Sequence, residues 1–144
     1  MIDRFLINSI YRATEGEGVF VGRPQIFVRF QGCSVGCVNC DSKDTWDFVS
    51  THQQYETLNG ILDEIQNQGA NKGIKNISIT GGDPLHPGHV PFVLELVKAL
   101  KNEGFYINIE AAGTRVVDEI FERVDFISFD LKTPSTHVKT PVKL

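Results

Sequence analysis

The chain has 144 residues, 41% of them hydrophobic and 22% charged, with a formal net charge of −4. This length and composition predict one globular domain over residues 1–144, and the negative charge argues against a nucleic-acid partner. No apolar run approaches the roughly 18 residues of a membrane span, and the N-terminus lacks the apolar core of a secretory signal. Three clustered cysteines fit a disulfide framework poorly. We therefore expect a cytoplasmic protein with no membrane partner.

Strands and helices are predicted in alternation along most of the chain. Short runs rich in β-branched and aromatic residues predict strands, and apolar residues three and four positions apart predict helices. Such alternation is typical of an α/β fold with a parallel sheet. Residues 132–144 show no periodicity and are expected to form an irregular tail. In chain order we expect a strand over 25–30, a helix over 56–68, a strand over 76–80, a helix over 89–102, a strand over 106–110, a short helix around 118–124 and a strand over 125–131.

Polar residues follow the predicted strand ends. The cysteines follow the first strand, Gly81, Gly82 and Asp83 follow the second, and Glu110 and Asp130 stand near the ends of the later ones. Because ligands bind at the carboxyl ends of parallel strands in α/β folds, we expect these groups to converge.

Cys33, Cys37 and Cys40 are the only cysteines in the chain, and three interpretations of them compete. Structural zinc takes four ligands, so a histidine such as His52 would have to complete the set. A disulfide would leave one spare thiol. A cubane iron–sulfur cluster, normally held by four thiolates, would keep one iron open for a small molecule. The last hypothesis is the one that we favour.

The C-x3-C-x2-C spacing of these cysteines resembles the signature of the radical S-adenosylmethionine (SAM) enzymes. In that superfamily the cofactor chelates the open iron of a [4Fe–4S] cluster, and its reductive cleavage yields a 5′-deoxyadenosyl radical. The stretch "TGGDP" (residues 80–84) resembles the Gly-Gly-Glu-Pro motif, whose backbone contacts the cofactor. Glycine permits a close approach because it has no Cβ. The resemblance implies a partial, minimal (β/α) barrel of the radical-SAM type.

The flanking segments resemble one family of these enzymes, 7-carboxy-7-deazaguanine synthase, over nearly the whole chain. They are "TEGEGVFVGRPQIFVRFQGCSVGCVNCDSKDTW" (14–46), "IEAAGT" (109–114) and "DFISFDLKTPS" (125–135). The resemblance implies a lyase of 7-deazapurine (queuosine-type) biosynthesis. It would contract 6-carboxy-5,6,7,8-tetrahydropterin to 7-carboxy-7-deazaguanine with loss of ammonia, and would require Mg²⁺. An external one-electron donor resembling flavodoxin is implied as a partner.

Position by position, the same resemblance implies a set of site residues. Arg29 matches the arginine that faces the substrate carboxylate, a pairing that suits a guanidinium fork. Ser42 matches the hydroxyl that ligates Mg²⁺, a hard cation that prefers oxygen. The implied substrate contacts are Thr14, Glu15, Gly16, Arg29 and Thr80. The implied cofactor contacts are Asn39, Cys40, Asp41, Gly81, Gly82, Asp83, Glu110, Ser128, Phe129 and Asp130.

The chain departs from the family pattern at several of these positions. Glu15 stands where the family usually has Gln, which replaces an amide by a carboxylate that only accepts hydrogen bonds. Asp83 stands where Glu is usual, and residues 128–130 replace a common Ser-Pro-Lys.

The family is also usually longer. Because the four predicted strands do not close a barrel, we expect a homodimer that covers the open edge of the sheet, with the tail near the interface.

Two alternatives to the synthase stay open from the sequence alone. The segment 81–97 resembles the activase of anaerobic ribonucleotide reductase, and Asp83 fits that family better. Against it, "EGEG", the strand that carries Arg29 and "DLKTPS" favour the synthase. The alternative from another class is a zinc-bound interaction module. His86 and His89 are interpreted as residues without a metal role.

Overall fold

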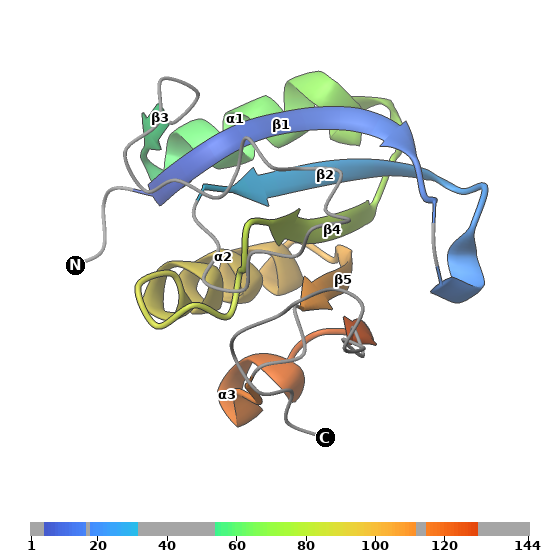
Figure 1. The fold of residues 1–144 in the computed structure, drawn as a ribbon. Helices are drawn as coiled ribbons and strands as arrows, with labels where there is room; N and C mark the ends of the chain where they lie inside the picture. Colours follow the sequence, from blue (N-terminus) through green and yellow to red (C-terminus); the bar gives the residue numbers. More distant parts are fainter. Residues whose placement is uncertain (1–4, 17, 32–53, 112–114, 130–144) are drawn as a thin grey trace.

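The computed structural model describes residues 5–16, 18–31, 54–111 and 115–129. Their main feature is a six-stranded sheet with the strand order β3-β1-β2-β4-β5-β6 (Figure 1). β2, β4, β5 and β6 are parallel neighbours, whereas β1 runs antiparallel to β2 and to β3. The strands are β1 (Phe5–Thr14), β2 (Pro24–Phe30), β3 (Gln54–Glu56), β4 (Asn76–Gly81), β5 (Tyr106–Ala111) and β6 (Phe126–Phe129).

Helices connect the parallel strands, as expected for an α/β fold. Helix α1 begins after Thr57, whose Oγ1 accepts a hydrogen bond from the Gly60 amide at 3.0 Å and so caps the first turn. No helix in the described ranges is long and apolar enough to cross a membrane. The helices are α1 (Leu58–Gln68), α2 (Val90–Asn102) and α3 (Asp118–Phe121), with short 3-10 turns η1 (Gly18–Phe20) and η3 (Ala70–Lys72).

The predicted α/β fold with a parallel sheet is confirmed, but the expectation of four strands is wrong. The sequence pattern misses β1 because its pairing register with β2 shifts between Ile7 and Ser9, and such an irregularity breaks the period of two. It also misses β3, which has only three residues, the last of which, Glu56, was expected to begin a helix. Consequently α1 begins at Leu58 rather than Glu56, and α3 ends at Phe121, before the expected Val124.

One face of the sheet is apolar and is covered by helices. The buried residues of α1 and α2 belong to the same hydrophobic core as the alternating isoleucines and valines of the strands. Full burial of each such side chain stabilises the fold by about 1.5–3 kcal/mol. The strand residues at the centre of this core are Ile26 and Val28 in β2, Ile77 and Ile79 in β4, and Ile107 and Ile109 in β5.

The other face, here called the polar face, carries the remaining alternate residues of the parallel strands. The segment between β1 and β2 folds over part of this face. Phe20 of η1 packs edge-on against Tyr106 and Phe126, with ring centroids 5.3 and 5.7 Å apart. The polar face comprises Gln25, Phe27 and Arg29 in β2, Asn76, Ser78 and Thr80 in β4, Tyr106, Asn108 and Glu110 in β5, and Phe126 and Ser128 in β6.

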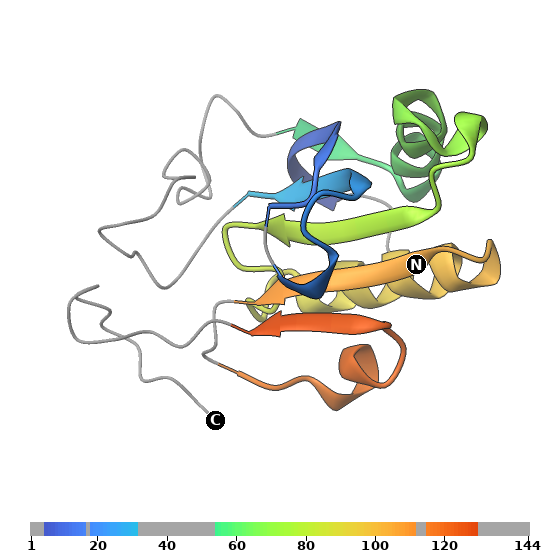
Figure 2. The same ribbon diagram turned by 90° about the vertical axis from the view of Figure 1, so that its right-hand side faces the viewer.

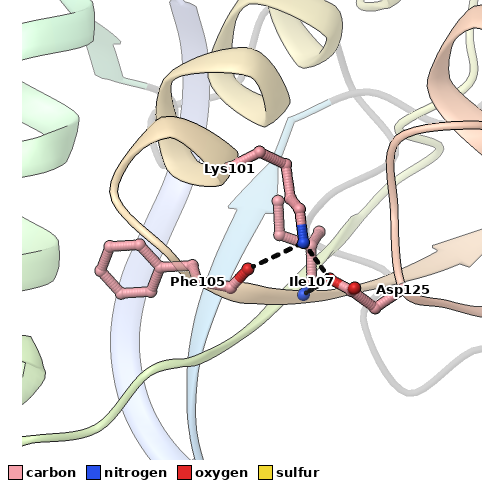
Figure 3. Close-up of polar contacts among 4 residues, drawn as sticks. All are labelled: Lys101, Phe105, Ile107 and Asp125. Carbon is pink, nitrogen blue, oxygen red and sulfur yellow. Dashed lines mark hydrogen bonds and ion pairs between the residues drawn. The ribbon is translucent and has the colours of Figure 1, made fainter.

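A polar contact joins the end of α2 to the amino-terminal ends of β5 and β6 (Figure 3). Lys101 of α2 donates to the Phe105 carbonyl at 3.2 Å and pairs with the Asp125 carboxylate at 2.7 Å. The same Asp125 oxygen accepts a hydrogen bond from the Ile107 amide at 2.8 Å. Because both charged side chains are partly exposed, the ion pair contributes no more than about 1 kcal/mol. Its role is to fix the entry of β6 beside β5.

Candidate functional site

Four of the sequence-predicted site residues lie in one row across the polar face. Arg29 in β2 is in register with Thr80 in β4, and Glu110 in β5 is in register with Ser128 in β6. The Thr80 hydroxyl joins the two pairs, because it donates to Glu110 Oε2 at 2.8 Å. Figure 2 shows the arrowheads of these four strands at the same edge of the sheet. The row therefore presents a cation, a hydroxyl, a carboxylate and a second hydroxyl at the carboxyl ends of the strands.

Arg29 is held at one end of the row and keeps a free donor. Its Nη2 donates to the Tyr11 hydroxyl at 2.7 Å. The ring of Tyr11 stacks on Phe27, with centroids 5.3 Å apart and planes 8° from parallel. Arg29 Nε is buried and has no hydrogen-bond partner among the residues that the structure describes. Since an orphaned buried donor is costly, the geometry favours an anionic or carbonyl ligand at this atom.

Gly81 and Gly82 contact the end of β2, and glycine is required at position 81. Gly81 has a φ of +132°, and a Cβ built there would overlap the backbone N and O of Phe30. The Gly82 amide donates to the Phe30 carbonyl at 3.0 Å. The sequence suggested that these glycines allow close backbone approach, and the close approach seen here is to β2, immediately before the cysteine segment.

Asp83 and two histidines lie next along the chain. Asp83 is fully buried, and its Oδ1 accepts from the Leu85 amide at 3.1 Å. His89 is buried beneath Phe30, with ring centroids 5.2 Å apart. His86 Nδ1 accepts from the Gly88 amide at 3.0 Å, and burial together with the nearby Arg115 lowers the pKa of His86 below 6.5. These contacts join the segment that follows β4 to Phe30 at the end of β2.

The N-terminal trio of implied substrate contacts is divided. Thr14 and Gly16 are exposed, and Thr14 pairs with Pro24 at the amino end of β2, away from Arg29. Glu15 is instead 3% exposed. Its Oε2 accepts from Gln25 Nε2 at 2.9 Å and from the Ser78 hydroxyl at 2.8 Å. Glu15 therefore ties the β1–β2 segment to the polar face.

Sequence reasoning missed three buried polar residues beneath the row: Gln25, Ser78 and Asn108. Each is at most 3% exposed. The signal was present in "NISIT" and "YINIE", where isoleucines alternate with polar residues. In a parallel sheet, whose faces are both usually covered and apolar, a buried polar alternation indicates a face that lines a ligand site.

The remaining candidate residues are placed as follows. Phe129 packs its ring against Phe121 of α3, with centroids 6.3 Å apart, so this side chain faces the helices. In the described ranges no group of three His, Cys, Asp or Glu side chains could hold a metal ion. Seven candidates lie outside the described residues: Cys33, Cys37, Asn39, Cys40, Asp41, Ser42 and Asp130.

The described residues fit a radical-SAM cofactor beside them. The cysteine segment follows directly from β2, whose end lies against Gly81 and Gly82. The adjacent row offers an unpartnered buried donor in Arg29 and a carboxylate in Glu110. A zwitterionic ligand needs both kinds of group. Three thiolates with no fourth cysteine suit a [4Fe–4S] cluster that leaves one iron open.

Comparison with known proteins places this arrangement in a family. Residues 27–143 match the family model described as Radical SAM superfamily. The chain is 34% identical over 114 residues to the 7-carboxy-7-deazaguanine synthase of Aquifex aeolicus (strain VF5), covering 79% of this chain and 48% of that protein. It is 32% identical over 130 residues to the enzyme of the same name from Escherichia coli (strain K12), covering 79% and 56%.

A solved structure agrees with these matches. The crystal structure of QueE from Escherichia coli superposes with a TM-score of 0.74 at 28% identity, covering 96% of this chain and 64% of that one. The chain spans about half the length of the curated relatives that it matches. With the superfamily match extending over most of its residues, the chain belongs to the Radical SAM superfamily, which implies a [4Fe–4S] cluster and S-adenosylmethionine.

Proposed function

We propose that the protein is a 7-carboxy-7-deazaguanine synthase, a lyase of 7-deazapurine biosynthesis. It would contract 6-carboxy-5,6,7,8-tetrahydropterin to 7-carboxy-7-deazaguanine and release ammonia. The relatives named above carry that name. The observation that carries the proposal is the row of Arg29, Thr80, Glu110 and Ser128 beside the end of β2. It offers donors and acceptors for a polar, anionic heterocycle at Arg29 and Thr80 and for the cofactor at Glu110 and Ser128.

The chain's own residues bind and orient the substrate in this proposal. Arg29 holds the substrate carboxylate through Nε and its remaining guanidinium hydrogens, because Tyr11 already occupies one site on Nη2. The Thr80 hydroxyl donates its hydrogen to Glu110, so its oxygen can only accept a hydrogen bond from a substrate N–H. Holding the pterin at its carboxylate and at an N–H restricts its orientation for hydrogen abstraction.

The cofactors complete the proposed site. Cys33, Cys37 and Cys40 would hold the [4Fe–4S] cluster, which when bound supplies the electron that cleaves SAM. We further propose that Ser42 ligates Mg²⁺ and that an external flavodoxin-like protein donates the electron. Glu110 and Ser128 are the described residues proposed to contact SAM, together with the backbone of Gly81 and Gly82.

Anaerobic reconstitution tests the function. The protein, loaded with iron and sulfide, is incubated with SAM, dithionite, Mg²⁺ and 6-carboxy-5,6,7,8-tetrahydropterin, and the product is identified by mass spectrometry. We expect 7-carboxy-7-deazaguanine, with less formed when Mg²⁺ is omitted. SAM cleavage without this product, or a colourless protein that binds zinc tightly, would contradict the proposal.

We also propose a homodimer that covers the outer edge of β6. In the described part of the sheet no strand pairs with that edge. An apolar groove of about 470 Å³ lies beside it, lined by Val116, Phe121, Ile127 and Phe129. Val116 is 53% exposed. A second copy would shield both features, since exposed edges are normally paired or covered.

Sedimentation velocity tests the dimer. Val116→Asp should shift the protein towards monomer, because it places a charge in the apolar groove. Val19→Asp is the matched control, since Val19 is a 73% exposed valine of η1 that does not line the groove. A wild-type protein that sediments as a monomer at micromolar concentration would contradict the dimer.

A further inference from the structure

A series of hydrogen bonds, here called the hydrogen-bond chain, lies on the polar face on the amino-terminal side of the row. It ends on the buried carboxylate of Glu15. Three donors point at the oxygens of Glu15: the Gly16 amide at 3.1 Å, Gln25 Nε2 at 2.9 Å and the Ser78 hydroxyl at 2.8 Å. A carboxylate only accepts hydrogen bonds. The Ser78 hydroxyl must therefore donate its single hydrogen to Glu15.

The direction of the next bonds follows from counting donors. With its hydrogen used, the Ser78 oxygen only accepts, and it lies within hydrogen-bond distance of two amide nitrogens, Gln25 Nε2 and Asn108 Nδ2. A hydroxyl oxygen has two lone pairs, so Ser78 is saturated. Arg23, which only donates, fixes the Gln25 amide independently, because its guanidinium faces Gln25 Oε1 at 3.3 Å.

The orientation of Asn108 in turn determines which hydrogen bond Ser128 makes. Because Asn108 turns Nδ2 towards Ser78, its Oδ1 faces Ser128, whose hydroxyl lies 3.3 Å away. Ser128 must then donate its hydrogen to Asn108. Among the described residues Ser128 Oγ has no other hydrogen-bond partner. Neither of its lone pairs therefore has a donor among the described residues.

We infer that the buried Glu15 carboxylate, acting through Ser78 and Asn108, makes Ser128 an obligatory hydrogen-bond acceptor towards the bound ligand. The inference rests on the proposed function in one respect, that a ligand occupies the polar face. Ser128 then selects a ligand group that donates, such as an amine, a ring N–H or a hydroxyl. A group with only lone pairs would be rejected, because two acceptors would face each other. Glu15, Ser78 and Asn108 are positioning residues in this scheme.

The identity of residue 15 decides the direction. Glu15→Gln keeps the shape but adds a donor, so the substituted side chain could donate to Ser78 through its new amide. The chain could then reverse, with Ser78 donating to a flipped Asn108 and Asn108 donating to Ser128. Ser128 would regain a hydrogen to point at the ligand, and the preference for a donor group would be lost.

A double-mutant cycle tests this coupling. Dissociation constants for SAM and for 6-carboxytetrahydropterin are measured separately by calorimetry on the anaerobically reconstituted protein. Ser128→Ala should weaken one of the two ligands about ten-fold, the value of one good hydrogen bond, and Ser128→Thr should retain the binding. Glu15→Gln should weaken the same ligand, and this effect should shrink several-fold when Ser128 is already Ala, although the two side chains share no hydrogen bond.

Two control variants should show no coupling to Ser128. Glu103→Gln makes the same charge change at an exposed position, and Ser9→Ala removes a hydroxyl that bonds only its neighbour Asn8 among described groups. If Glu15→Gln does not fold, Ser78→Ala cuts the chain at its centre and should show the same coupling. Additive effects, or an unchanged affinity for both ligands in Ser128→Ala, would overturn the inference. Failure of the proposed function is distinct, because wild-type protein would then bind SAM and not the pterin.

Discussion

Replacing Gly81 by alanine should destabilise the fold much more than replacing other glycines with positive φ. Gly81 has a φ of +132°, a conformation that costs a residue with a side chain on the order of 1–3 kcal/mol. Its new Cβ would also overlap the Phe30 backbone, so β2 and β4 would have to separate at their carboxyl ends. The hydrogen bond from the Gly82 amide to the Phe30 carbonyl would be lost with that movement, at a cost of about 1 kcal/mol.

Together the backbone strain and the lost hydrogen bond predict a loss of about 2–4 kcal/mol in the free energy of unfolding, a large share of the roughly 5–15 kcal/mol of a typical domain. The assay is urea unfolding of the thiol-reduced, metal-free protein, followed by circular dichroism. Gly104→Ala is the matched control. Gly104 has a φ of +80° with no atom within 4 Å of the added Cβ, so it should lose only about 1–2 kcal/mol. If Gly81→Ala lost no more stability than Gly104→Ala, the close approach to Phe30 would not be the reason for glycine here.

Three further outcomes are expected. Cys37→Ala should abolish the brown chromophore and bound iron after anaerobic reconstitution, and iron analysis showing a full cluster would contradict the assignment. Tyr11→Phe should raise the KM for the carboxylated pterin several-fold at a nearly unchanged kcat, because it removes the hydroxyl that holds Arg29 at 2.7 Å and keeps the ring; an unchanged KM would refute this role. Since the pKa of His86 is lowered from 6.5 on folding, the unfolded chain takes up this proton first as the pH falls, so stability present above pH 6.5 declines below it. His86→Gln should reduce that decline in urea unfolding at pH values on either side of 6.5, and an identical pH profile would count against it.

The sequence predicted the four parallel strands of the sheet because each of them is short, β-branched and closed by a turn. It did not predict β1, whose irregular pairing near Ile7 and Ser9 hides the alternation from a single-sequence pattern. Arg29, Thr80, Glu110 and Ser128 were implied by resemblance, and only the strand register shows that they share one row. No sequence pattern contains a register, since it is set by pairing between distant segments.

The residues that sequence reasoning missed explain why this sheet tolerates a polar interior. Burying Gln25, Ser78, Asn108 and a carboxylate would cost several kcal/mol if their groups were unpaired. Each described bond in the chain instead has a donor for its acceptor, and the single charge receives three of them. A buried network in which every group is hydrogen-bonded is rigid and has one arrangement. Apolar residues at these positions would leave the side chains of the neighbouring row free to rotate. Burying these polar side chains is explained if their role is to orient the side chains of the row. We therefore expect ligand selectivity in this protein to depend on residues that never touch the ligand, with Glu15 as the first of them.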